Sequence, residues 1–218
     1  MFLAETNTLV SPLFWAMQPY LAAMVVVLVI GAFKAEIKGW LGEWAVNRKL
    51  ATQLDPQLYQ NLPNLMLHVN GATSQIDHVV LSPFGIFVIE TKNYRGWIFG
   101  KVDEKLWTKK IYRSTFTFPN PIRQNAGHIS ALMAATGLPK AVFHSVVVFM
   151  CGTEFKSNFP PNVLHAAELI AYIRSYTQRV LEVDHLPAIR ANLERAAASV
   201  TAKQRANHVP NIRKRIGK

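Results

Sequence analysis

Cysteine is almost missing from this 218-residue sequence, and glycine-rich loops that bind nucleotide phosphates are missing altogether. The single cysteine, Cys151, excludes an intramolecular disulfide framework and any zinc or iron–sulfur centre built from several cysteines. The 7 histidines show none of the paired spacings typical of a metal site. Half of the residues are hydrophobic, which is enough for one sizeable core with additions around it.

Acidic residues are scarce as well. The chain has 13 of them against 24 Lys and Arg, which gives a formal net charge of +11. This imbalance suggests an anionic partner, either a nucleic acid or a phospholipid surface. The end of the chain, Lys203 to Lys218, is basic and contains no acid. It is either a contact to DNA or anionic lipid, or a solvated tail.

The N-terminal part of the chain has no charged residue between Glu5 and Lys34. The mostly apolar segment from Leu13 to Phe33 would rise about 31 Å as a helix, close to the roughly 30 Å of a bilayer core. Because no Lys or Arg precedes it, the pattern favours an uncleaved transmembrane anchor over a signal peptide. Lys34 and Lys38 follow it, so the positive-inside rule predicts a cytoplasmic C-terminal part. The alternative is a buried core helix.

The remainder of the chain alternates helical and strand patterns, which predicts a mixed α/β layer fold. Two β-branched runs around a Pro/Gly turn predict a β-hairpin over residues 76–92. We expect further strands at 96–102, 106–112 and 141–151, and helices at 37–54, 121–136, 166–180 and 187–206.

Ionisable residues are expected to meet at the open end of the predicted hairpin. Folding the chain about its turn places Asp77 opposite residue 90 or 91, and therefore beside Glu90. Lys92 follows Glu90 by two residues, so both side chains lie on one face of the strand. Glu43 falls within the apolar stripe of the preceding helix and should face the core.

These residue types suit hydrolysis of a phosphodiester. Two neighbouring carboxylates repel each other unless a divalent cation neutralises them, and oxygen ligands favour Mg²⁺ or Mn²⁺. Asp77, Glu90 and the backbone carbonyl of Thr91 are the candidate metal ligands. Lys92 would orient the attacking water and stabilise charge on the phosphate. The alternative is that Glu90 and Lys92 form a solvated pair on an edge strand.

The same residues carry a family resemblance, which covers roughly residues 41–138. The sequence resembles the nuclease-related domain family, NERD, which is grouped with the PD-(D/E)XK nuclease superfamily. The resemblance rests on four stretches, which are Gly42-Glu43, Gln75-Ile76-Asp77-His78, Gly85 to Tyr94 with Gly96, and Asn120-Pro121-x-x-Gln124.

The resemblance implies a restriction-endonuclease-like mixed sheet flanked by helices, here preceded by one transmembrane helix. It implies catalytic roles for Glu43, Asp77, Glu90 and Lys92. Gln75 and Gln124 match polar positions of the domain and are assigned to substrate binding. The proline of the superfamily's name is replaced by Ile76, which is not a ligand position.

The predicted organisation has a short N-terminal segment (1–12), a transmembrane helix (13–33), the nuclease-related domain (34–182), and a helix with the basic tail (183–218). We expect a membrane-anchored, cytoplasmic nuclease-like protein that cleaves DNA with Mg²⁺ or Mn²⁺. One alternative is a catalytically inactive module that tethers nucleic acid or a protein partner to the membrane, and another is a lipid-interacting membrane protein with no nucleic-acid role. The sequence does not indicate an oligomeric state.

Aromatic and basic residues are interleaved between positions 97 and 118. They could stack on bases and bind phosphates, although a half-exposed sheet would show the same pattern. The aromatic residues are Trp97, Trp107, Tyr112, Phe116 and Phe118, and the basic residues are Lys101, Lys105, Lys109, Lys110 and Arg113.

Overall fold

The structure is a computed structural model. It describes the backbone of residues 7–69, 71–150 and 152–201, and their side chains except at 7–13 and 28–38. The chain divides into two compact units, Met1–Trp40 and Leu41–Lys218. The predicted basic tail from Lys203 to Lys218 lies outside the described residues.

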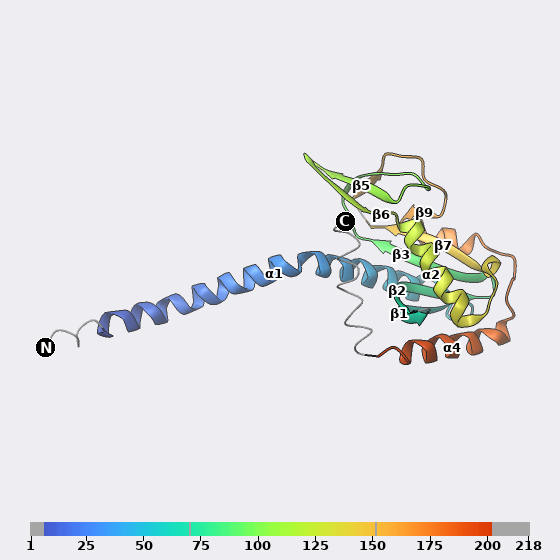
Figure 1. Cartoon of the computed structure of the whole chain (residues 1–218), viewed down its shortest axis with the longest axis horizontal. Coiled ribbons are helices and arrows are strands. Elements are labelled where there is room, and N and C mark those ends of the chain that lie inside the picture. Colours follow the sequence, from blue (N-terminus) through green and yellow to red (C-terminus); the bar gives the residue numbers. More distant parts are fainter. Residues whose placement is uncertain (1–6, 70, 151, 202–218) are drawn as a thin grey trace. The chain divides into compact units, whose positions relative to one another are not determined.

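Helix α1 (Asn7–Gln53) forms the described part of the first unit and ends in the second (Figure 1). Within the described residues, no helix combines the length and the apolar character that a membrane span requires. The transmembrane helix predicted at 13–33 is therefore not supported. The described side chains of that segment, residues 14–27, include the polar or helix-breaking Gln18, Pro19 and Tyr20, and its other side chains lie outside the described residues. The predicted membrane and cytoplasmic locations stay predictions.

The second unit is built on a mixed five-stranded sheet with the order β1-β2-β3-β7-β9. The first three strands are antiparallel, whereas β7 and β9 run parallel to β3. The strands are β1 (Gln60–Val69), β2 (Ala72–Ser82), β3 (Gly85–Lys92), β7 (Phe143–Phe149) and β9 (Val163–His165). The predicted mixed α/β fold is confirmed.

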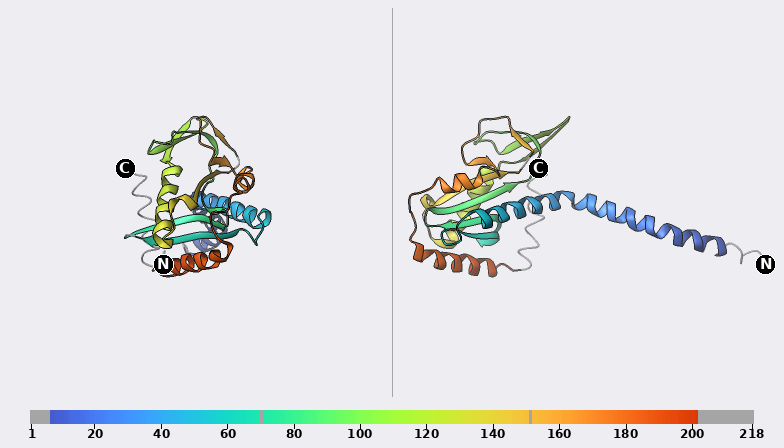
Figure 2. Two further views of the ribbon diagram at one scale, coloured as in Figure 1. Left: turned by 90° about the vertical axis from the view of Figure 1, so that its right-hand side faces the viewer. Right: turned by 180° about the vertical axis from the view of Figure 1, so that it is seen from behind.

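Helices cover both faces of this sheet. Along β3, Ile86 and Val88 pack with α2 (Pro121–Thr136) and α4 (Leu186–Ala198), whereas Phe87 and Ile89 pack with the end of α1 and with α3 (Leu169–Arg174). Alternate side chains of a strand point to opposite faces, so a strand buried on both faces is apolar throughout. Two short 3₁₀ helices, Lys140–Val142 and Val183–His185, complete the connections. Figure 2 shows α2 and α4 against the sheet from two further sides.

A second, four-stranded sheet has the order β6-β5-β4-β8. Its strands are β4 (Gly96–Phe99), β5 (Leu106–Ile111), β6 (Ser114–Pro119) and β8 (Thr153–Phe155). Trp107 and Phe118 from this sheet pack with Phe149 and Val147 of the first sheet in one apolar cluster. The cluster fixes the second sheet beside the end of β3.

Asn120 joins the second sheet to helix α2. Its side-chain oxygen caps the helix by accepting from the amides of Ile122 and Arg123. Its amide nitrogen donates to three backbone carbonyls of the loop 101–104, at 2.7 to 3.2 Å. The side chain is buried, so the helix start and the loop are joined through one polar residue.

We expect Asn120→Ala to lower the free energy of unfolding by about 3 kcal/mol, because it removes a helix cap and the hydrogen bonds that hold the loop 101–104. Urea unfolding monitored by circular dichroism measures this loss. Asn120→Asp keeps the cap but not the amide donor, so its loss should be intermediate. A loss below about 0.5 kcal/mol, the size of an ordinary surface substitution, would contradict this role.

Candidate active site

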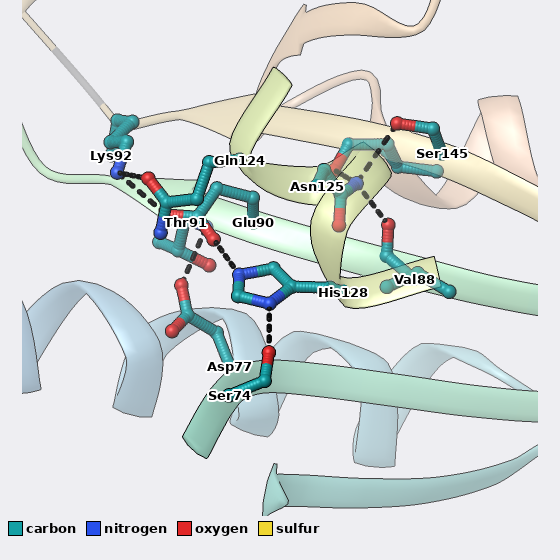
Figure 3. A network of polar contacts seen from close by, with 11 residues as sticks. Ser74, Asp77, Val88, Glu90, Thr91, Lys92, Gln124, Asn125, His128 and Ser145 are labelled. Atoms are coloured by element: carbon teal, nitrogen blue, oxygen red, sulfur yellow. Dashed lines mark hydrogen bonds and ion pairs between the residues drawn. The ribbon is translucent and has the colours of Figure 1, made fainter. Parts of the chain in front are cut away.

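The β2–β3 hairpin brings two acidic residues side by side. The ladder between these strands pairs Ser82 with Gly85 at the turn and ends with His78 opposite Ile89. The next pair in that register is Asp77 and Glu90. The Thr91 amide donates a 2.7 Å hydrogen bond to Asp77 Oδ2, which holds the aspartate against the neighbouring strand (Figure 3).

Glu90 and Lys92 form a largely buried ion pair. Lys92 Nζ lies 2.5 Å from Glu90 Oε1, and the two side chains are 14% and 3% exposed. Lys92 Nζ also donates to Gln124 Oε1 at 3.1 Å. The low exposure excludes the solvated edge-strand pair that the sequence left open. The two hydrogen bonds hold the ammonium group between the oxygens of Glu90 and Gln124.

Helix α2 supplies a histidine to the same cluster. His128 Nε2 lies 3.1 Å from Glu90 Oε2, and His128 Nδ1 lies 2.7 Å from Ser74 Oγ. Because an ionised carboxylate only accepts hydrogen bonds, Nε2 is the donor. Sequence reasoning missed His128, because it tested the histidines only for metal spacing. The available signal was its position one helical turn after Gln124, on the same face of the predicted helix.

Asn125 fixes the helix that carries these residues. Its side-chain nitrogen donates to the carbonyls of Val88 and Val146, at 2.7 and 3.2 Å, and to Ser145 Oγ at 2.9 Å. The side chain is fully buried. One residue therefore ties α2 to both central strands, β3 and β7.

Glu43 approaches the cluster from the end of α1. The residue before it, Gly42, packs so closely that an added Cβ would lie 2.9 Å from the Cβ of Asn93. A glycine is thus required where the helix passes the end of β3. Glu43 is half-buried and interacts electrostatically with Glu90 and Lys92.

The carboxylates perturb one another's ionisation. Burial raises the pKa of Asp77 well above its ordinary value, and the charges of Glu90 and Glu43 raise it further, against the opposing Thr91 amide and Lys92. Burial also raises the pKa of Glu43, and repulsion from Glu90 adds to this shift.

In the ion pair of Glu90 and Lys92, by contrast, the pKa shifts favour the charged forms. Burial alone would raise the pKa of Glu90, but the charge of Lys92 and the contact with His128 lower it below its ordinary value. Burial alone would lower the pKa of Lys92, but the charge of Glu90 raises it. Asp77 is therefore the carboxyl group whose negative charge is least compensated.

Of the other predicted site residues, Gln124 contacts this cluster and Gln75 contacts β1 instead. Gln75 donates a 2.7 Å hydrogen bond to Asn64 of β1, so its contact leads toward β1 and not toward β3. Gln124 contacts Lys92 directly. The Thr91 hydroxyl is buried without a hydrogen-bond partner among the described residues.

The part of the chain that the structure describes contains no group of three or more His, Cys, Asp or Glu side chains placed to hold a metal. The arrangement is a pair of adjacent carboxylates. Mg²⁺ commonly uses one or two protein carboxylates and takes its other ligands from water and substrate phosphate. Glu90 oxygens each accept one hydrogen bond and keep a second acceptor position. The residues therefore fit a magnesium ion bound by Asp77 and Glu90.

The chain is similar to known proteins over more than half of its length. Residues 38–150, more than half of the chain, match the family described as nuclease-related domain. An uncharacterized protein of Bacillus anthracis is 38% identical over 169 residues, which is 72% of this chain and 77% of that protein. No solved structure matches the chain.

Proposed function

The chain belongs to the nuclease-related domain family, and on this premise we propose that it hydrolyses phosphodiester bonds in DNA with Mg²⁺ or Mn²⁺ as cofactor. The observation that carries the proposal is the pairing of Asp77 with Glu90 across the hairpin, beside the buried ammonium group of Lys92. Metal-dependent hydrolysis of a phosphodiester needs negative oxygen ligands for the cation and a fixed positive group near the phosphate.

Asp77 and Glu90, with the backbone carbonyl of Thr91, would hold the cation. A bound divalent ion would neutralise the two carboxylates, polarise a phosphoryl oxygen and lower the pKa of a bound water. Asp77 must be ionised to act as a ligand, and its raised pKa reflects a negative charge that a cation would compensate.

Lys92 would stabilise the phosphate, and Glu43 would hold the attacking water. Glu90 and Gln124 orient the Lys92 ammonium group, so that it can stabilise developing negative charge without first reorganising. Glu43 is half-buried, has a raised pKa and interacts electrostatically with Glu90 and Lys92, so it would hold water and accept a proton.

His128 would act as a positioning residue through Glu90. We expect His128→Ala to lower kcat by about 10- to 100-fold, the usual effect of removing a group that orients a metal ligand. Loss of the Nε2 donor also raises the pKa of Glu90, because His128 lowers it in the native protein. A glutamate that holds its proton more tightly is also a poorer metal ligand, so the Mg²⁺ concentration that gives half-maximal cleavage should rise about tenfold or more.

A control separates this role from a structural one. His128→Gln keeps a side-chain donor and should recover part of the activity. His68→Ala removes a histidine that contacts Thr73 beside the β1–β2 turn, and its Mg²⁺ requirement should match that of the native protein. An unchanged Mg²⁺ requirement in His128→Ala would contradict the positioning role.

The proposed function is tested by incubating the purified full-length protein with supercoiled plasmid across a Mg²⁺ or Mn²⁺ titration. We expect nicked or linear products that disappear when the metal is chelated. Salt-sensitive DNA binding without cleavage at any metal concentration would overturn hydrolysis and support the non-catalytic module instead.

A further inference from the structure

The second sheet separates its aromatic residues into a buried and an exposed group. Trp107 and Phe118 are 0% and 6% exposed and belong to the core. Trp97, Tyr112 and Phe116 are 43%, 96% and 51% exposed. A half-exposed sheet, which the sequence left open, also has a buried and an exposed group of side chains, so the cations beside the exposed rings carry the distinction.

Trp97 lies on β4 between two lysines. Lys110 Nζ is 5.8 Å and Lys156 Nζ is 4.9 Å from the centre of its ring. Lys156 also pairs with Glu154 on β8, and the Glu154 side chain accepts a hydrogen bond from Trp97. Lys110 and Lys156 provide positive charge beside the ring, and its exposed part suits a flat, negatively charged ligand.

Phe116 lies on the other face of the hairpin and leads toward the candidate active site. Lys109 Nζ is 5.1 Å from the Phe116 ring and 4.4 Å from the ring of Tyr94. Tyr94 follows Lys92 by two residues along the chain. Phe116, Lys109 and Tyr94 thus form a series of aromatic and cationic groups that runs from the hairpin to within two residues of the proposed catalytic lysine.

Tyr112 at the turn between β5 and β6 has an unfavourable backbone and buries nothing. Its φ angle is 52°, which a bulky residue rarely adopts. A strained conformation persists where the surrounding structure or a function maintains it. The turn continues with Arg113, and the segment from Leu106 to Pro119 has no acidic residue. Figures 1 and 2 show this hairpin projecting from the second unit.

We propose that the β5–β6 hairpin, together with Trp97, binds single-stranded nucleic acid and delivers it to the site around Lys92. Unpaired bases expose the flat faces that aromatic rings stack on, and their phosphates match the neighbouring lysines. The identity of the polymer rests on the proposed nuclease function. A protein partner would require an apolar centre, whereas each exposed ring of Trp97 and Phe116 lies beside a cation.

Fluorescence anisotropy of a labelled oligothymidine, titrated with the full-length Asp77→Asn protein in chelator, measures this binding without cleavage. Tyr112→Ala combined with Phe116→Ala should raise Kd at least about tenfold, since one stacked base contributes enough free energy for that change. Tyr112→Phe combined with Phe116→Tyr keeps both rings and should bind like the parent. Lys110→Gln with Arg113→Gln should reduce the salt slope by about 1.4, or about 0.7 for each lost phosphate contact.

Thermal unfolding shows whether these exposed positions leave the fold intact. Unchanged oligothymidine binding by the double alanine variant would overturn the inference, even if the native protein cleaves plasmid. Loss of binding to anionic phosphatidylglycerol vesicles, with oligothymidine binding unchanged, would overturn it in favour of a lipid surface. Reduced oligothymidine binding in a protein that never cleaves plasmid would support the inference while contradicting the proposed hydrolysis.

Discussion

Replacing Asp77 by Asn should abolish metal-dependent DNA cleavage and at the same time stabilise the folded protein at neutral pH. Cleavage is lost because an amide is a poor ligand for Mg²⁺ and cannot balance its charge. The fold gains stability because burial and repulsion from Glu90 and Glu43 penalise the ionised aspartate. We expect a gain of about 1 kcal/mol, within the usual range for relieving a strained functional site.

The sign of the pH dependence distinguishes this cause from a change in packing. The folded pKa of Asp77 lies above its ordinary value of 3.8. Its stabilising contribution is therefore complete below pH 3.8 and is lost as pH rises through the folded pKa. The advantage of Asp77→Asn should be largest at neutral pH and disappear in acid.

Urea unfolding at several pH values measures this difference, with the exposed Asp184→Asn as the matched control. Asp184→Asn should leave both cleavage and stability near those of the native protein. Cleavage by Asp77→Asn at the native rate would contradict the proposed role, and a loss of stability at neutral pH would contradict the electrostatic cause.

Replacing Lys92 by Met should have the opposite effect on stability. It leaves the buried Glu90 carboxylate with only His128 as a partner. Breaking a buried ion pair by removing one partner typically costs about 3 to 5 kcal/mol. Cleavage should fall by at least about 100-fold, since a preorganised cation near the phosphate is lost.

The cost of Lys92→Met should depend on pH within a defined window. Glu90 has a folded pKa below its ordinary value of 4.5, so its contribution is present above pH 4.5 and lost in acid. Lys92 has a folded pKa above 10.5, so its contribution is present below pH 10.5 and lost above it.

Denaturant unfolding between these limits should therefore show the largest loss for Lys92→Met. Lys92→Arg retains the positive charge and should recover most of the stability, though not the cleavage rate, because its planar fork places charge differently. A loss for Lys92→Met that stays the same in acid would show that the lost side-chain volume, and not the ion pair, is responsible.

Local signals explain why part of the structure was predictable. Helix 121–136 was predicted with its observed bounds, because Asn120 caps it, Pro121 begins it, and Gly137 ends it with a φ of 73°. The hairpin turn around Pro83 fixes the register, and the register places Asp77 beside Glu90. Both inferences depend on residues close together in the sequence.

The parts that were missed depend on tertiary contacts. Strand β1 contains Pro63 and an Asn64 with a φ of 54°, and both are poor strand signals. The sheet tolerates them because β1 lies at its edge. The contact between His128 and Glu90 joins residues that are 38 positions apart. Packing in a cluster with Phe149 buries Trp107, whereas Trp97 stays exposed.

The most direct measurement is a titration of the full-length protein with Mn²⁺, followed by electron paramagnetic resonance of the free ion. We expect the native protein and Asp184→Asn to bind one ion at the Asp77–Glu90 pair, more weakly as pH falls through the raised pKa of Asp77. Asp77→Asn should lose that ion. Equal Mn²⁺ binding by the native protein and Asp77→Asn, or no binding by either, would contradict a shared cation site.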